Sequence, residues 1–321
     1  MITKILNYKS IQALLSTLIV LGAIICIFTP NYFLFKMGSQ FAVQIMIGYL
    51  LLAMIFLVFQ QSRLMFTSFA CCAGLCIFLK YSSNPILTAP AVNSTAKISV
   101  AHFNLSASDE NYLNTVQQIV DSKADLVSLQ EVTPDWHQVL QETLIEKYPY
   151  SNSIIRFDPF GIAVYSKYPI QDLDTFFYED IPNLTGKVKA QGNGKEIQFI
   201  ASHTTPPLYQ SAYNRMQEHL LLISEYATKI DIPILTLGDY NAPPWWAEIQ
   251  QLKEVANLED SRRSAYLGFA DIFNNPVDYI FYSNHLTCID FKPIRSLNSA
   301  HLGIKGMYQF NSNESDVAQK D

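Results

Sequence analysis

Acidic residues are missing from the first quarter of this 321-residue chain. From Met1 to Tyr81 there is no Asp or Glu, and the only charged side chains are five cations. The other 17 of the 22 Lys and Arg residues and all 28 acidic residues follow, so the first part carries +5 and the second −11. This division predicts two units. The acidic unit would be repelled by nucleic-acid phosphates, which disfavours a constitutive nucleic-acid-binding role.

Cysteines are also scarce outside the first part. Four of the five lie before residue 82, within apolar sequence that predicts small packing residues. The second unit contains only Cys288, which excludes an internal disulfide there and a zinc site built from cysteines.

Three long apolar runs fill the first part, and residues 1–81 are predicted to form a transmembrane anchor. The predicted helices cover residues 11–28, 41–59 and 64–80. A bilayer core requires about 20 apolar residues in a helix. The second run nearly meets this length unaided, the first does so if it extends to Phe35, and the third is short and weakened by Ser68 and Gly74. A cleaved signal peptide is the alternative for the first run, but two further runs follow and no small-x-small cleavage site is evident.

The cations that flank these runs predict an orientation. In a three-span anchor, Lys4, Lys9 and Arg63 lie on one side, and Lys36 and Lys80 on the other. The excess favours a cytoplasmic N-terminus, with the second unit outside the cytoplasm and attached to the plasma or inner membrane. Two spans would reverse that, so the third helix decides the sidedness. Residues 82–96 are predicted to be a linker without helical periodicity, and residues 311–321 a disordered tail.

The second unit, residues 97–310, is predicted to be an α+β sandwich of two sheets with helices outside. Its early part alternates strands and helices, and its later part is dominated by strands. Strands are predicted at residues 97–103, 126–129, 162–166, 187–191, 196–202, 233–237, 277–282 and 302–310, and helices at 111–123, 134–147 and 211–229.

Polar residues recur where the predicted strands begin or end. Because α/β sheets bind ligands beyond strand ends, such positions predict a functional site. Each residue alone is more typical of a turn or a solvated surface than of a functional site. The seven residues that share this placement are Asn104, Glu131, His203, Asp239, Asn241, Asp278 and His301.

The motifs that carry these residues resemble the endonuclease/exonuclease/phosphatase superfamily, the DNase-I-like fold. They are His-Phe-Asn104-Leu, Gln-Glu131-Val, Phe160-Gly-Ile-Ala-Val-Tyr-Ser, Ser-His203-Thr-Thr-Pro-Pro, Gly-Asp239-Tyr-Asn241 and Val-Asp278-Tyr-Ile-Phe, in order along the chain. The resemblance implies a four-layer α/β/β/α sandwich, here of a membrane-anchored bacterial type. It also implies hydrolysis of a phosphodiester or phosphomonoester with Mg²⁺ or Mn²⁺, on a nucleic-acid or phospholipid substrate.

The resemblance further implies a role for each residue. Glu131 is expected to be the main metal carboxylate, with Asn104 beside it. Asp239 matches the residue that positions or deprotonates the attacking water, and Asn241 one that holds a phosphate oxygen. His203 and His301 are expected to donate hydrogen bonds to the phosphate, with one of them a candidate general acid, and Asp278 is expected to pair with His301.

Other residues near these motifs allow either a role in the site or a purely structural role. Arg215 could support the site, or pair with Glu218 on its own helix. Trp245 and Trp246 could pack under the Asp239 loop or line a substrate face. Four histidines to which the motifs give no role are expected to be surface or packing residues: His102, His137, His219 and His285.

One position departs from the family pattern. Relatives carry Ser-Asp-His where this chain has Ser299-Ala300-His301, and the missing Asp is a family metal ligand. A larger ion, a substrate phosphate or a neighbouring acid such as Asp260, Asp271 or Asp290 could compensate. Two hypotheses follow: a metal-dependent phosphoesterase, or a catalytically impaired protein that binds a phosphorylated ligand on the same fold.

Overall fold

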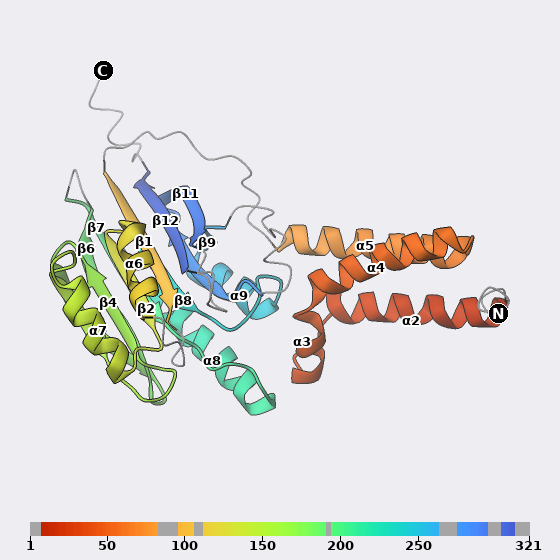
Figure 1. Ribbon diagram of the computed structural model, residues 1–321, viewed down its shortest axis with the longest axis horizontal. Helices are drawn as coiled ribbons and strands as arrows, with labels where there is room; N and C mark the ends of the chain where they lie inside the picture. The colour runs from red at the N-terminus through yellow and green to blue at the C-terminus, as the bar shows by residue number, and fades with distance from the viewer. Residues whose placement is uncertain are drawn as a thin grey trace, which may run out of the picture.

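The chain folds into a bundle of long helices that projects from a sandwich of two β-sheets (Figure 1). This computed structural model describes residues 8–82, 96–105, 112–190, 194–262, 275–294 and 303–311. Nearly all of the predicted linker and tail, together with Asp271, Ala300 and His301, lies outside these ranges.

The bundle contains α2 (Lys9–Ile27), α4 (Ala42–Val58) and α5 (Ser62–Tyr81). By length and composition, α2 and α5 could each cross a membrane. The second run behaves differently from its prediction. Helix α4 has 17 residues and reaches the required length only together with α3 (Phe33–Ser39), from which it is bent by 56°. The predicted weak helix, α5, has 20 residues.

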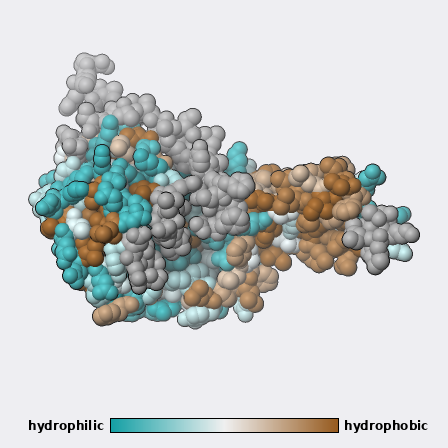
Figure 2. Space-filling model, viewed as in Figure 1, coloured by the Kyte–Doolittle hydropathy of each residue, from teal (hydrophilic) through white to brown (hydrophobic). Residues whose placement is uncertain are grey.

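The bundle exposes apolar side chains rather than hiding them. Its small core includes Ile19, Tyr49, Leu64 and Leu75, whereas many leucine, isoleucine and phenylalanine side chains point outward. Figure 2 shows this contrast, with hydrophobic residues over the projecting bundle and many hydrophilic ones over the visible face of the sandwich. An exposed apolar surface of this extent is typical of a membrane or protein contact.

Two six-stranded sheets form the sandwich in the described part of the chain, and each contains one parallel pair. The first has the order β11 (Leu286–Ile294), β12 (Gly303–Phe310), β1 (Lys97–Asn104), β2 (Leu126–Gln130), β4 (Ile162–Ser166), β3 (Tyr150–Ile154). The second has the order β5 (Ile170–Tyr178), β6 (Ile181–Lys189), β7 (Glu196–Ser202), β8 (Ile234–Asp239), β10 (Asp278–Ser283), β9 (Leu258–Asp260).

Helices cover the outer face of each sheet and complete four layers. Helices α6 (Tyr112–Ser122) and α7 (Pro134–Leu144) pack on the first sheet, and α8 (Gln210–Ala227) and α9 (Ala247–Ala256) on the second. Helix α7 begins as its sequence predicts, because Thr133 Oγ1 accepts a hydrogen bond from the N–H of Trp136 and proline occupies the first turn. The α+β sandwich expected from the sequence is therefore confirmed.

The alternation of side chains along β1 shows how the layers are filled. Ile98 and Val100 point into the core between the sheets, whereas Ala101 and Phe103 pack under α6 and α7. Successive strand residues point to opposite faces, so His102 and Asn104 share the face of Ile98. The polar end of β1 is thus directed toward the second sheet.

Several elements were missed in the sequence. These are β3, β5, β9, β11 and α9, and the strand predicted at 187–191 is β6, which starts at Ile181. Strands β3, β5, β9 and β11 lie at sheet edges. Much of β5 is exposed, and its mixed side chains lack a strict alternation. In β6, Pro182 and Gly186 argue against a strand locally, but pairing with both β5 and β7 overrides this preference.

Candidate active site

The predicted site residues that the structure describes meet at one edge of the sandwich, where strands of both sheets end. Asn104 ends β1 opposite Gln130 in the parallel β1–β2 pair, and Glu131 follows β2. In the other sheet His203 follows β7, and Asp239 ends β8 opposite Asp278 in β10. Two parallel pairs, one in each sheet, thus direct their carboxyl ends to a common edge.

Asp239 lies at the centre of a hydrogen-bond chain. Its side chain is buried, and its Oδ2 accepts from Asn104 Nδ2 at 3.4 Å, across the two sheets. Its Oδ1 accepts from the N–H of Asn241 at 2.9 Å. Asn241 Nδ2 in turn donates to the carbonyl of Thr204, the residue after His203, at 2.8 Å. The structure therefore brings together Asn104, Asp239, Asn241 and the His203 loop.

Gln130 holds the two sheets together at this edge, a role not predicted from the sequence. Its Oε1 accepts from the N–H of Asp239 at 3.0 Å, and its Nε2 donates to the carbonyl of Ser202. A Cβ on Gly238 would stand 1.8 Å from that carbonyl, so only glycine permits so close an approach. The Gln-Glu and Gly-Asp motifs therefore fit together through Gln130 and Gly238.

Glu131 is presented by an unusual backbone conformation. Its φ of 60° lies in the left-handed region, which non-glycine residues seldom adopt. The next residue, Val132, donates its N–H to the carbonyl of Gly161 at 3.1 Å. A Cβ on Gly161 would meet the Val132 carbonyl at 2.2 Å. The Phe-Gly-Ile motif thus packs on the Glu131 turn, and the half-buried carboxylate lies at the sheet edge.

His203 is buried and held by one ring nitrogen. Its Nδ1 is 3.0 Å from the carbonyl of Pro159, so Nδ1 carries a proton, and Nε2 is the ring nitrogen that this contact does not engage. Arg156 fixes the Pro159 loop through Asp158, and this hydrogen bond is the main reason that the pKa of Asp158 is lowered. The ring orientation of His203 is therefore set before any substrate binds.

Asp278 contacts a histidine that was expected to be a packing residue. His102 Nε2 lies 3.2 Å from Asp278 Oδ1, and His102 is fully buried. The expected pairing of Asp278 with His301 is not tested, since His301 falls outside the described ranges. The sequence held a signal for His102: strand alternation places it on the face of Asn104, toward the other sheet.

The two tryptophans contact Ser39 of α3, on the bundle side of the sandwich. Trp245 Nε1 donates to the carbonyl of Ser39 at 2.8 Å, and Trp246 Nε1 to Ser39 Oγ at 3.0 Å. Trp246 is buried among α8 and α9. Since both follow Asn241 within five residues, the site loop is attached to the α3–α4 turn.

Arg215 and two of the histidines without a predicted role contact structural partners. Arg215 pairs with Glu179 at 2.5 Å and Asp180 at 3.7 Å, so its expected pairing with Glu218 is replaced by contacts to the β5–β6 turn. His219 is buried with Nε2 2.8 Å from Asn183 Oδ1, as a packing residue should be. His137 lies near Ser153, and His285 is exposed.

The donor set at the edge suits a hard divalent cation. Within the residues that the structure describes, no three His, Cys, Asp or Glu side chains converge to hold an ion. The Glu131 carboxylate and the side-chain carbonyl oxygen of Asn104 offer oxygen ligands at neighbouring strand ends, and Asp239 lies beside Asn104. Mg²⁺ accepts one or two carboxylates and keeps several waters or substrate phosphate oxygens. This sparse oxygen set therefore fits Mg²⁺ or Mn²⁺ better than a soft metal.

Comparison with known families identifies the family of the chain. The model of the Endonuclease/Exonuclease/phosphatase family matches residues 101–301, more than half of the chain. The chain belongs to that family. No curated protein matches the sequence.

Solved structures show the same fold at low identity. An endonuclease/exonuclease/phosphatase from Bacteroides vulgatus is 18% identical with a TM-score of 0.56, covering 68% of this chain and 100% of that one. A mannosyl-6-phosphatase from Bacteroides thetaiotaomicron is 18% identical with a TM-score of 0.53, covering 66% and 100%. D. rerio TDP2 complexed with single-strand DNA product is 15% identical with a TM-score of 0.53, covering 66% and 99%.

Proposed function

We propose that the protein is a membrane-anchored, metal-dependent phosphoesterase that hydrolyses a phosphodiester or phosphomonoester. The observation that carries this proposal is the hydrogen-bond chain from Asn104 through Asp239 and Asn241 to the His203 loop. Structural neighbours named for a phosphosugar phosphatase and for a DNA product support a phosphoester substrate.

The residues at the edge divide the reaction between them. Glu131 and Asn104 would hold a Mg²⁺ or Mn²⁺ ion, which polarises the phosphoryl oxygens when bound. Asp239 orients the attacking water and takes its proton as the oxygen–phosphorus bond forms. With both ring nitrogens protonated, His203 keeps its Nδ1 proton on the Pro159 carbonyl and donates its Nε2 proton to the oxygen of the leaving alcohol as its bond to phosphorus breaks, with His301 as a further donor. Asn241 holds a phosphate oxygen. Asp278, which contacts His102, also pairs with His301.

The bundle supports membrane attachment through three spans, of which α4 is the second, with α3 bent from it by 56° at its sandwich end. Helix α2 starts at the tip of the bundle and α5 ends at the sandwich (Figure 1), so the two ends of the anchor lie on opposite sides. Lys36 pairs with Glu248 inside the junction and is neutralised there. The cation excess at the tip then favours a cytoplasmic tip and a sandwich outside the cytoplasm, on the plasma or inner membrane.

The proposal is tested with the full chain purified in detergent, supplied with Mg²⁺ or Mn²⁺. Bis-p-nitrophenyl phosphate, p-nitrophenyl phosphate and single-stranded DNA serve as substrates. We expect Asp239→Asn to lower kcat by about 10³-fold, because the general base is lost. Glu131→Gln should raise the metal concentration needed for half-maximal activity, since a charged ligand is removed.

Matched control variants separate these roles from general damage. Asp231→Asn alters an exposed acid just before the opposite end of β8, and Glu259→Gln alters an exposed acid in β9. Both should keep the parent activity. Full turnover in Asp239→Asn would contradict the assigned chemistry. No turnover with either metal, together with binding of a phosphorylated ligand, would favour the ligand-binding alternative, and Ala300→Asp should then create activity.

A further inference from the structure

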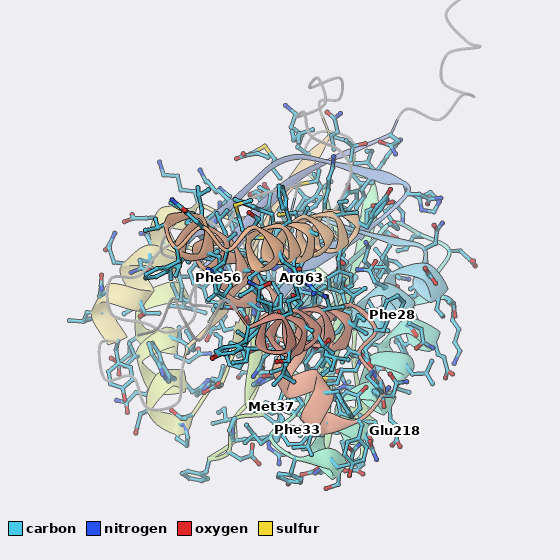
Figure 3. All side chains as sticks on the ribbon, turned by 90° about the vertical axis from the view of Figure 1, so that its right-hand side faces the viewer. Phe28, Phe33, Met37, Phe56, Arg63 and Glu218 are labelled. Carbon is cyan, nitrogen blue, oxygen red and sulfur yellow. The ribbon has the colours of Figure 1, made fainter. Side chains whose placement is uncertain are left out.

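The exposed apolar surface of the bundle continues onto the base of the sandwich. Helix α3 runs across the base of the bundle (Figure 1), and its two sides differ. Lys36 and Ser39 are buried against the sandwich, whereas Leu34 is 69% exposed and Met37 40% exposed. Figure 3, which views the bundle end on, places Phe33 and Met37 of α3 below the bundle, on the side where Glu218 of α8 also lies. A short helix with one apolar face outward is typical of an element lying in a membrane interface.

The loop from β7 to α8 adds apolar side chains beside α3. Leu208 is 73% exposed and Tyr209 58% exposed, although both are large and apolar. The next residue, Gln210, accepts a hydrogen bond from the N–H of Phe33 at 2.8 Å, which fixes this loop against α3. Leu208 and Tyr209 therefore extend the surface formed by Leu34, Phe35 and Met37.

The same loop begins at the site. His203 is five residues before Leu208, and the carbonyl of Thr204 accepts from Asn241. The site is attached to α3 by a second path, because Trp245 and Trp246 both donate to Ser39. Lys36 and Glu248 close this junction at 2.9 Å inside the protein. The orientation of the site relative to the bundle is thus set by two loops that carry proposed catalytic residues.

We propose that α3 together with Leu208 and Tyr209 lies in the interface of the bilayer that the bundle crosses, and that the site hydrolyses phosphoesters carried by lipids of that bilayer. This rests on the proposed phosphoesterase function. Tyrosine at such a boundary places its apolar ring in lipid and its hydroxyl in the headgroup layer. The acidic second unit, with 17 basic against 28 acidic residues, disfavours capture of a long polyanion such as DNA.

Lipid contact is tested without reference to activity. The full chain is reconstituted in phosphatidylcholine vesicles in which part of the lipid carries bromine on its acyl chains, a quencher of tryptophan fluorescence. Leu208→Trp should show quenching above that of the parent chain. Leu113→Trp, at a position 76% exposed on α6 of the other sheet, should not. Equal quenching of the two variants, or none in either, would overturn the docking surface.

Substrate class is tested by a ratio of activities in the same vesicles. Hydrolysis of the phosphatidylcholine is compared with that of water-soluble bis-p-nitrophenyl phosphate. Leu208→Ser with Tyr209→Ser should lower the lipid-to-soluble ratio about tenfold, because two apolar anchors are lost, whereas Leu113→Ser should not change it. Cleavage of soluble diesters or DNA without cleavage of lipid would overturn the lipid assignment and leave the phosphoesterase standing. Absence of all hydrolysis with Leu208→Trp still quenched would instead overturn the proposed function.

Discussion

Two buried polar clusters contain the two ends of the segment 239–248. The carboxylate at each end has a different kind of hydrogen-bond donor. At the site, where strands of both sheets end, Asp239 accepts hydrogen bonds from the side-chain amide of Asn104 and the N–H of Asn241, which are both neutral donors. At the junction, Glu248 accepts from the ammonium of Lys36 at 2.9 and 3.0 Å and from the hydroxyl of Tyr213. These two donors are neutral, whereas the ammonium of Lys36 balances the charge of Glu248.

The difference separates a place for chemistry from a place for attachment. A carboxylate that keeps its charge can attract a cation or take a proton. The junction instead encloses its ion pair with aromatic rings: Lys36 Nζ lies 5.5 Å from the Trp246 ring centre and 5.8 Å from that of Tyr213. Burial and Glu248 raise the pKa of Tyr213, so its hydroxyl stays protonated as a donor. We therefore expect neutral substitutions at the catalytic edge to reduce activity but not stability. Neutral substitutions at the junction should reduce stability but not activity.

The largest stability effect should come from breaking the junction. Lys36→Met leaves the Glu248 charge buried without its cation, which should lower the free energy of unfolding by about 3–5 kcal/mol. The measurement is chemical denaturation of the full chain in detergent. Lys147→Met, at an exposed lysine after α7, is the matched control.

A double variant sharpens this result. Lys36→Met with Glu248→Met removes both charges and keeps apolar volume, so most of the lost stability should return. If Lys36→Met alone is as stable as the parent, the buried ion pair does not hold the anchor to the sandwich, and the comparison of the two clusters fails.

A smaller effect is expected from a neutral histidine inside the sandwich. Burial, with smaller contributions from His203 and Arg215, lowers the pKa of His219 to about 3. The unfolded chain takes up this proton below about pH 6.5 and the folded chain does not, so stability falls as the pH drops from 6.5 to 3. Between pH 7 and 5, His219 should account for a loss of about 2 kcal/mol.

The test compares the pH dependence of unfolding in two variants. His219→Gln, which can still donate to Asn183, should lose less stability on acidification than the parent. His285→Gln, at an exposed histidine, should follow the parent curve. Identical curves for the parent and His219→Gln would mean that His219 titrates normally in the folded protein.

The same clusters show why the sequence predicted the edge well and the junction poorly. Asp239, Asn241 and Glu131 follow apolar strands, and local pattern and motif were enough to place them at strand ends. Lys36 was predicted to be a cation flanking an apolar helix, because nothing nearby in the sequence indicates its partner Glu248, which is 212 residues away. Trp245 and Trp246 were placed near the site, but their partner Ser39 lies beyond the reach of local pattern. Long-range pairs between units follow from tertiary packing, which periodicity does not encode.

The smallest effect is expected at Arg215, which the sequence left between a site role and a surface pair. Its guanidinium pairs with Glu179 and Asp180, and both acids are more than half exposed. Exposed pairs are screened by water and salt, so Arg215→Ala should change the free energy of unfolding by less than about 1 kcal/mol. Denaturation at low and at high salt measures this, with Arg215→Lys as the variant that keeps the charge. A tenfold loss of kcat at unchanged stability would instead give Arg215 a supporting role at the catalytic edge, and rescue by lysine would show that its charge is what the edge requires.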